Sequence, residues 1–226
     1  MKPHPKVRIP EGWARFHGVS LIFSEFGDVP LFGEDAALKV RGILDDPVLA
    51  EHSFRPLPPE TYHVTLADLI HDGLTDLPPE VAVSGEGRVD IPGAAEILAP
   101  HLQDSELLAP GAVGLDLEFS AVTYFQGRAL AVVLKPTEQS ADLYRSLDQR
   151  RGALLEGAAH LGVARSAWKP HVTLGYFAYP ELGKQAADRH LADLAAAVGA
   201  ALHATRIHVS EPHLFGFVDM QTFNVI

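Results

Sequence analysis

The segment HVTL occurs twice in the chain, at His63–Leu66 and again at His171–Leu174. The two copies begin 108 positions apart, from His63 to His171, in a sequence of 226 residues. Each copy lies in a short apolar stretch that predicts a β-strand, and a predicted helix precedes each strand. The repeat therefore predicts a fold with two similar halves, one motif in each.

The order of residues within the motif assigns its side chains to two faces. Side chains alternate along a strand, so His63 and Thr65 should share one face, as should His171 and Thr173. The Val and Leu of each copy are then expected to face the core. On a regular strand, Asp68 would point away from the face that carries Thr65.

The rest of the chain predicts a mixed α+β fold. Strands are expected at residues 18–24, 62–70 and 170–177, at 115–125 and 129–135 as a hairpin, and twice or three times between 202 and 226. Helices are expected at 34–44, from 137 to about 161 with Thr137 as N-cap, and from Pro180 onward. Residues 90–109 predict only short helix and loop, because Pro92 and Pro100 interrupt them. No linker separates independent domains.

Composition limits the partners and the location of the protein. Apolar residues make up 47% and charged residues 21%, the balance of a globular protein and not of a disordered one. The formal net charge of −11 repels nucleic-acid backbone, which argues against bulk DNA or RNA binding but allows a phosphorylated ligand in a local basic pocket. No apolar run predicts a membrane span, and the basic first six residues lack a signal-peptide core.

The absence of cysteine excludes disulfides, thiolate nucleophiles and metal sites built on Cys. It also suits a reducing compartment. We therefore expect a cytoplasmic protein that makes no membrane contact, and a monomer.

The two motifs together suit phosphodiester chemistry. If the strands met across a pseudo-twofold axis, two imidazoles and two hydroxyls would face one cleft. A neutral His could take a proton from attacking water or a hydroxyl, while a protonated His donates one to the leaving oxygen. The Thr hydroxyls could stabilise the phosphate oxygens by donating hydrogen bonds. This scheme requires no metal.

The paired motifs, their spacing and the order of elements resemble the 2H phosphoesterase superfamily, named for two His-x-Ser/Thr-x motifs. The resemblance spans about residues 18–226. Segments 57–70 and 171–177 (HVTLGYF) are similar to an uncharacterised bacterial branch related to 2′–5′ RNA ligase and cyclic phosphodiesterase proteins. Known relatives act on 2′,3′-cyclic phosphates, on ADP-ribose cyclic phosphate or on 2′–5′ linked oligonucleotides, and some bacterial members join RNA.

This resemblance implies a bilobal, pseudo-twofold α+β fold with antiparallel sheets lining a central cleft and helices outside. It implies one domain over residues 1–226, with interleaved halves at about 18–110 and 111–226. His63 and His171 would be the acid and the base, in either assignment, and Thr65 and Thr173 would bind phosphate. Neither a metal nor a cofactor is expected. The chain departs from many relatives at Ala67-Asp68, where they have an aromatic residue or glycine, so the substrate class stays open.

Other side chains near the motifs are candidates for substrate contact. Lys169, and Arg165 further upstream, could screen phosphate charge at the cleft rim, or could be solvated loop cations. Among the aromatic residues Tyr62, Phe125, Trp168 and Tyr176, we single out Trp168 and Tyr176 as residues that could stack on a base. Aromatic residues beside apolar strands more often pack in the core than contact a ligand.

Several weaker patterns predict no site. His71-Asp72 alone is a poor metal signal and fits a loop after a strand. His203 and His208 would face opposite ways on a regular strand, which argues against a metal site shared with His213. The segment Gly85-Glu86-Gly87 lacks the third glycine and following helix of a dinucleotide site, and no P-loop or H-E-x-x-H occurs.

The sequence thus predicts a metal-independent phosphoesterase. Its substrate would be a cyclic (2′,3′-type) or 2′-linked phosphodiester of a small nucleotide or RNA end. The alternative is a non-catalytic module that kept the cleft and binds a nucleotide or RNA end, although mere binding needs no acid–base pair. A metal hydrolase built on the abundant His residues is the third reading, and the spacing above disfavours it.

Overall fold

The computed structural model describes residues 4–8, 12–23, 31–74, 77, 81, 83, 87–108, 114–125 and 128–226, with Ala187 described by its backbone alone. Position 24, positions 84–86 of the glycine-containing segment, and positions 126–127, where the sequence predicts a hairpin turn, lie outside these ranges.

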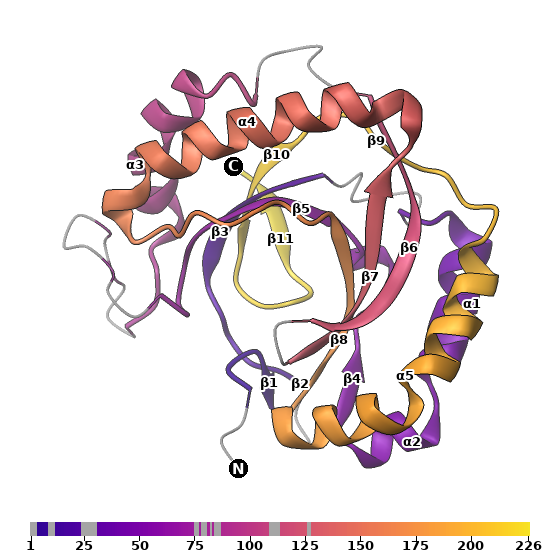
Figure 1. Ribbon diagram of the computed structural model, residues 1–226. Helices are drawn as coiled ribbons and strands as arrows, with labels where there is room; N and C mark the ends of the chain where they lie inside the picture. Colours follow the sequence, from indigo (N-terminus) through magenta and orange to yellow (C-terminus); the bar gives the residue numbers. More distant parts are fainter. Residues whose placement is uncertain are drawn as a thin grey trace.

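Two antiparallel sheets form the framework, and each carries one motif strand (Figure 1). The four-stranded sheet has the order β11 (Phe223–Val225), β10 (His213–Phe217), β3 (Gly18–Phe23) and β5 (Val64–His71). The five-stranded sheet has the order β4 (Phe54–Pro56), β8 (His171–Phe177), β7 (Ala129–Pro136), β6 (Leu115–Phe125) and β9 (Ile207–Val209). β1 (Val7–Arg8) and β2 (Gly12–Trp13) form a small separate ribbon.

The sheets exchange strands between the two parts of the chain. β4 comes from the first part and pairs with motif strand β8, while β10 and β11 come from the C-terminal end and join the sheet of motif strand β5. Gly175 permits the first exchange, because a Cβ at this position would lie 2.4 Å from the carbonyl oxygen of Arg55.

The helices lie outside the two sheets (Figure 1). α5 (Pro180–Leu202) packs on β6 and on α1 (Glu34–Leu44), with the short α2 (Pro47–Glu51) beside β4. α3 (Ile91–Asp104) and α4 (Ala141–Gly157) pack against β3 and β5 of the other sheet. Single 3₁₀ turns complete the helical elements at η1 (Pro59–Thr61), η2 (Glu138–Ser140) and η3 (Ala159–Leu161). The expected α+β fold, with antiparallel sheets inside and helices outside, is confirmed.

The helix expectation fails at residues 90–109. One helix, α3, runs from Ile91 to Asp104 through Pro100. The Asp90 carboxylate caps it by accepting the Gly93 N–H, and Pro92 occupies the first turn, where no N–H is needed. Its buried stripe of Ala94, Leu98 and Leu102 keeps the segment helical, since packing outweighs the local cost of an exposed proline.

The expected cap of the next helix is right in position only, since Thr137 is the N-cap residue of η2. Thr137 makes no side-chain cap, and its buried hydroxyl has no partner among the described atoms. The helical stretch instead divides into η2, α4 and η3, the last of which ends at Gly162 with a positive φ of 79°. Within the described residues, no helix combines the length and the apolar character that crossing a membrane requires.

Candidate active site

The two motif histidines begin the strands that face each other across the molecule. His63 directly precedes β5, which begins at Val64 and not at Tyr62 as expected, and His171 is the first residue of β8. The Val and Leu of both motifs are buried, as the alternation predicts. The motif histidines and threonines are only partly exposed.

Both imidazoles are held in the same way. The Nδ1–H of His63 donates to the carbonyl oxygen of Thr61 over 2.8 Å, and that of His171 donates to the carbonyl oxygen of Lys169 over 2.8 Å. A carbonyl oxygen can only accept, so each bond fixes the proton on Nδ1 and turns Nε2 away from the backbone. The repeat in sequence is thus a repeat in geometry, because each His bonds the residue two positions before it.

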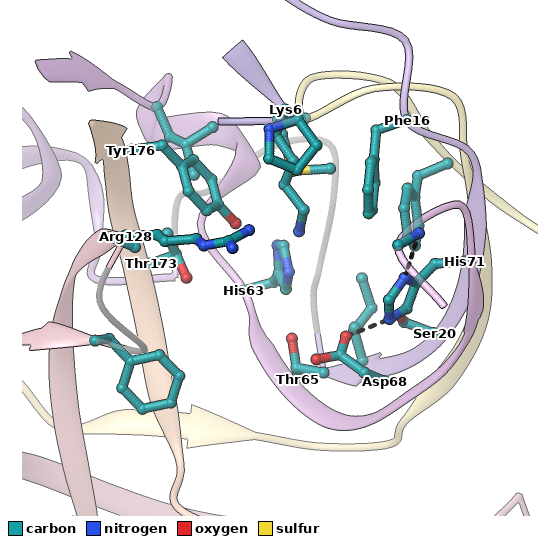
Figure 2. Close-up of a pocket in the computed structure, with 18 of the residues that line it drawn as sticks. Lys6, Phe16, Ser20, His63, Thr65, Asp68, His71, Arg128, Thr173 and Tyr176 are labelled. Atoms are coloured by element: carbon teal, nitrogen blue, oxygen red, sulfur yellow. Dashed lines mark hydrogen bonds between the residues drawn. The ribbon is translucent and has the colours of Figure 1, made fainter. Parts of the chain in front are cut away.

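One cavity of about 250 Å³ brings the four motif side chains together. Figure 2 shows His63, Thr65 and Thr173 around it. His63, Thr65, His171 and Thr173 all line it. A second hollow of about 750 Å³ shares with it the wall formed by Thr65, Asp68, His71, Phe125 and His171. The cleft therefore offers room on both sides of the paired motifs.

Each motif strand bulges directly after its threonine. In β5, Thr65 pairs with Ile22 and Ala67 with Leu21, so Leu66 is the extra residue. In β8, Thr173 pairs with Ala131 and Gly175 with Leu130, so Leu174 is the extra residue. Such a bulge shifts the facing of every later side chain by one position.

The bulges correct the expectation for Asp68. Its partner on β3 is Ser20, and the Ser20 hydroxyl donates to the Asp68 carboxylate over 3.2 Å. A second irregularity in β5 then brings His71 opposite Gly18, on the same face. Asp68 and His71 consequently line the cavity with Thr65, and His71 is not part of a loop after the strand.

Burial and nearby charge control the protonation of both motif histidines. Burial lowers the pKa of His63 to about 4; the Thr61 carbonyl and the Asp68 carboxylate oppose this shift, while His171 and Lys6 reinforce it. Burial also lowers the pKa of His171, against the Lys169 carbonyl and Asp68. The depression is larger at His63, which feels the Lys6 ammonium.

An aromatic ring flanks each imidazole. The Phe125 ring stacks on His171, with ring centroids 4.0 Å apart and planes inclined by 28°. The Phe223 ring meets His63 edge-on at 5.1 Å. Both rings line the cavity, so they hold the imidazoles in place and form apolar wall on either side of the motifs.

The three other candidates for substrate contact, Tyr176, Trp168 and Lys169, lie in different surroundings. Tyr176 lines the cavity beside the motifs. Trp168 does not line it: the residue is 4% exposed, borders the second hollow, and stacks on Tyr144 with ring centroids 4.9 Å apart. Lys169 is exposed and lines the second hollow, and its carbonyl oxygen orients His171.

Two buried side chains tie the motif segments to each other. The Trp168 indole N–H donates to the Thr65 carbonyl oxygen over 3.0 Å, from the loop before one motif to the strand of the other. Arg151 of α4 donates from Nε to the Leu66 carbonyl oxygen over 2.5 Å and from Nη1 to the Ser166 carbonyl oxygen over 2.6 Å. These bonds fix the relative position of the two histidines.

Sequence reasoning missed the cations of the cavity, Lys6 and Arg128. No local pattern could identify them, since they lie on loops far from either motif in sequence. Asp68 did leave a signal: it follows His63 by five residues, as Tyr176 follows His171. Comparing the two halves position by position would have placed both side chains in the cleft.

Metal ligation has no support in the part of the chain that the structure describes, where no group of three or more His, Asp or Glu side chains is arranged to hold an ion. His208 instead pairs with Asp116 at 2.8 Å.

Comparisons with known proteins show the fold. No protein-family model and no curated protein matches the chain. A solved structure of a conserved protein of unknown function from Agrobacterium tumefaciens is similar over 100% of this chain and 93% of its own, with 13% identity and a TM-score of 0.61. A structure described as a phosphoesterase aligns over 93% of this chain and 95% of its own at 17% identity and a TM-score of 0.45.

LigT from E. coli in its apo form aligns over 94% of this chain and 96% of its own, with 17% identity and a TM-score of 0.45. Similarity at these identities identifies a fold and not an activity.

Proposed function

We propose that this chain is a 2H-type phosphoesterase that hydrolyses a cyclic (2′,3′-type) or 2′-linked phosphodiester of a small nucleotide or RNA end, without a metal. The observation that carries the proposal is the matched pair of imidazoles. Each is anchored through Nδ1 to a backbone carbonyl, and both line one cavity together with two threonine hydroxyls.

The charges around the two histidines favour one assignment of roles. His63 has the more strongly depressed pKa and lies near the Lys6 ammonium, so it is the neutral base. His171 lacks this cation among its charge partners, and a bound phosphate anion counteracts the lowering of its pKa by burial, so it is the protonated acid. Asp68 supports protonation at both positions.

The reaction then proceeds by in-line attack on a cyclic phosphate. Nε2 of His63 takes a proton from water as the water oxygen bonds to phosphorus. The bond from phosphorus to one ribose oxygen breaks, and Nε2–H of His171 donates the proton that this oxygen needs. The product is a nucleoside 2′- or 3′-monophosphate, and both histidines return to their starting states by exchange with solvent.

The threonines complete the scheme. Their hydroxyls line the cavity on both sides of the imidazoles and can donate to the two non-bridging phosphate oxygens. Such bonds strengthen as negative charge builds up on these oxygens in the transition state.

Turnover of 2′,3′-cyclic mononucleotides in the presence of EDTA tests the proposal, with both monophosphate isomers followed. His63→Ala and His171→Ala are each expected to lose about a thousandfold or more in kcat, because the two groups act as a unit. His203→Ala, at an exposed position at the end of α5, is the matched control. Full activity in either motif variant, or activity that EDTA abolishes, would overturn the two-histidine mechanism.

We further propose that the enzyme acts as a monomer in the cytoplasm and that residues 1–226 form one bilobal domain. The exchange of β4, β10 and β11 between the sheets supports a single domain, since neither half would form its sheet alone. The absence of cysteine supports a reducing compartment.

A further inference from the structure

The cavity concentrates positive charge in an acidic protein. The chain carries a formal net charge of −11. The charged residues that line the cavity, histidines aside, are Lys6, Arg128 and Asp68. Cations therefore outnumber carboxylates on this wall, the reverse of the chain as a whole.

The two cations lie at one end of the cavity, away from Asp68. In Figure 2 the side-chain ends of Lys6, Arg128 and Tyr176 point toward the space next to His63 and Thr173, whereas Asp68, Ser20 and His71 form the opposite end. The Lys6 ammonium lies 4.7 Å from the centre of the Phe16 ring and 5.3 Å from that of Tyr176. The cavity is thus polarised along its length.

Backbone bonds hold both cations in position. The Lys6 carbonyl oxygen accepts the Ala14 N–H over 3.0 Å, and its N–H donates to Nδ1 of buried His4 over 3.1 Å. The Arg128 carbonyl oxygen accepts the Phe177 N–H over 3.1 Å, next to Tyr176 on β8. The backbone of both segments is therefore fixed against the cleft, with the Lys6 residue half-buried and the Arg128 residue exposed at its rim.

Within the ranges that the structure describes, no carboxylate forms an ion pair with Lys6 or Arg128, so these residues leave both cations without a neutralising partner. Burial together with both cations lowers the pKa of His4, which also lines the cavity, to about 3, so it adds no charge of its own. Two uncompensated cations at one end of a partly enclosed cavity favour an anionic ligand there.

The scissile phosphate does not account for both cations. A phosphodiester carries one negative charge, and the protonated imidazole and two threonine hydroxyls already face it in the scheme above. From this excess of charge we infer a second anion subsite, formed by Lys6, Arg128 and the Tyr176 hydroxyl, that takes a phosphate monoester carried by the substrate in addition to the scissile diester. This inference rests on the proposed function.

A pair of substrates that differ in one phosphate tests the subsite. The wild-type protein is given adenosine 2′,3′-cyclic phosphate with and without a 5′-phosphate. We expect kcat/KM to be about tenfold or more higher for the 5′-phosphorylated substrate, since each hydrogen bond to a charged group contributes about that factor. In Lys6→Met/Arg128→Met this ratio should fall to about one. Lys39→Met, an exposed change on α1, should keep the wild-type ratio.

Two outcomes would overturn the subsite while the proposed function stands. One is a ratio near one in the wild-type protein. The other is an equal loss for both substrates in the double variant, which would assign the cations to the scissile phosphate itself.

Calorimetry measures nucleotide binding and so tests the subsite independently of turnover. If neither substrate is turned over, the proposed function fails for these nucleotides, and binding decides the subsite alone. The subsite predicts that adenosine 3′,5′-bisphosphate binds about tenfold or more tighter than 3′-AMP or 5′-AMP, and that the double variant abolishes this difference. Equal affinities for the three nucleotides would overturn it.

Discussion

Asp68 and Tyr176 occupy equivalent positions in the two halves, each three residues after the motif threonine and each turned into the cleft by a one-residue bulge. The same position therefore carries a carboxylate in the first half, at one end of the cavity, and a phenol in the second half, at the other end. The two halves thus share their catalytic geometry but differ in charge, so the cleft can orient a substrate in one direction.

Replacing Asp68 with Asn is expected to shift the pH profile of kcat/KM toward lower pH. The carboxylate raises the pKa of both His63 and His171, so its removal lowers both. The acidic limb, which reports deprotonation of the base, and the basic limb, which reports loss of the proton from the acid, should move in the same direction. Asp35→Asn, an exposed change at the start of α1, is the control. Limbs that stay in place would contradict a charge role for Asp68.

Arg151→Met should lower both activity and stability. Arg151 is 6% exposed, and its loss leaves the carbonyl oxygen of buried Leu66 without this donor and also removes the bond to the Ser166 carbonyl oxygen. We expect the free energy of unfolding to fall by about 1–3 kcal/mol and kcat to fall about tenfold or more as the motif strands shift. Urea unfolding and steady-state kinetics measure the two effects.

Two further variants separate charge from position at Arg151. Arg151→Lys keeps the charge and should recover part of kcat if it still reaches Leu66. Arg150→Met, on the same helix with only a 3.5 Å contact to the Glu106 carbonyl oxygen, should change neither quantity by much. Loss of stability with an unchanged kcat would show that Arg151 does not position the motifs.

Thr65→Val is expected to reduce kcat/KM by about a hundredfold, because the variant cannot donate a hydrogen bond to the phosphate in the transition state. Thr65→Ser retains the hydroxyl and should recover most of this loss. Stability should change by less than about 1 kcal/mol, since the Thr65 side chain is partly exposed to the cavity. Similar activities for the Val and Ser variants would exclude the hydroxyl from the reaction.

Acid should destabilise the fold, and His4 should be one cause. In the unfolded chain His4 takes up a proton near pH 6.5, but in the folded protein its pKa is about 3. The unfolded state therefore binds more protons between these values, so stability falls as pH falls, with a slope of up to about 1.4 kcal/mol per pH unit from this group.

His4→Gln removes this contribution and keeps an acceptor for the Lys6 N–H. Urea unfolding at several pH values from 7 to 4 should give a flatter curve for the variant than for the wild-type protein. His203→Gln, at an exposed position, should follow the wild-type curve. Parallel curves for His4→Gln and wild type would refute the assignment.

Trp168→Phe tests whether the indole acts on substrate or on the fold. The ring would keep its stack on Tyr144 and lose the hydrogen bond to the Thr65 carbonyl oxygen. We expect a loss of about 1 kcal/mol in stability and a moderate fall in kcat with KM unchanged. A selective rise in KM for purine nucleotides would instead support stacking on the base.

The sequence alone determined those features that depend on short-range order along the chain, above all the two faces of the repeated tetrapeptide. Alternation along a strand placed the valines and leucines in the core and the histidines and threonines together, and the helix at 34–44 and the start of α5 at Pro180 followed from periodicity and proline. These features depend on neighbours within a few residues, so the sequence alone carries them.

Tertiary structure decided the rest of the site. The bulges that turn Asp68 and Tyr176 inward depend on pairing with β3 and β7, and the helix through Pro100 depends on a buried stripe that packs on other elements. Lys6 and Arg128 meet only because segments more than a hundred residues apart pack on one cleft. Charge acts through space and not along the chain, so the substrate-facing field of this protein exists only in the folded state.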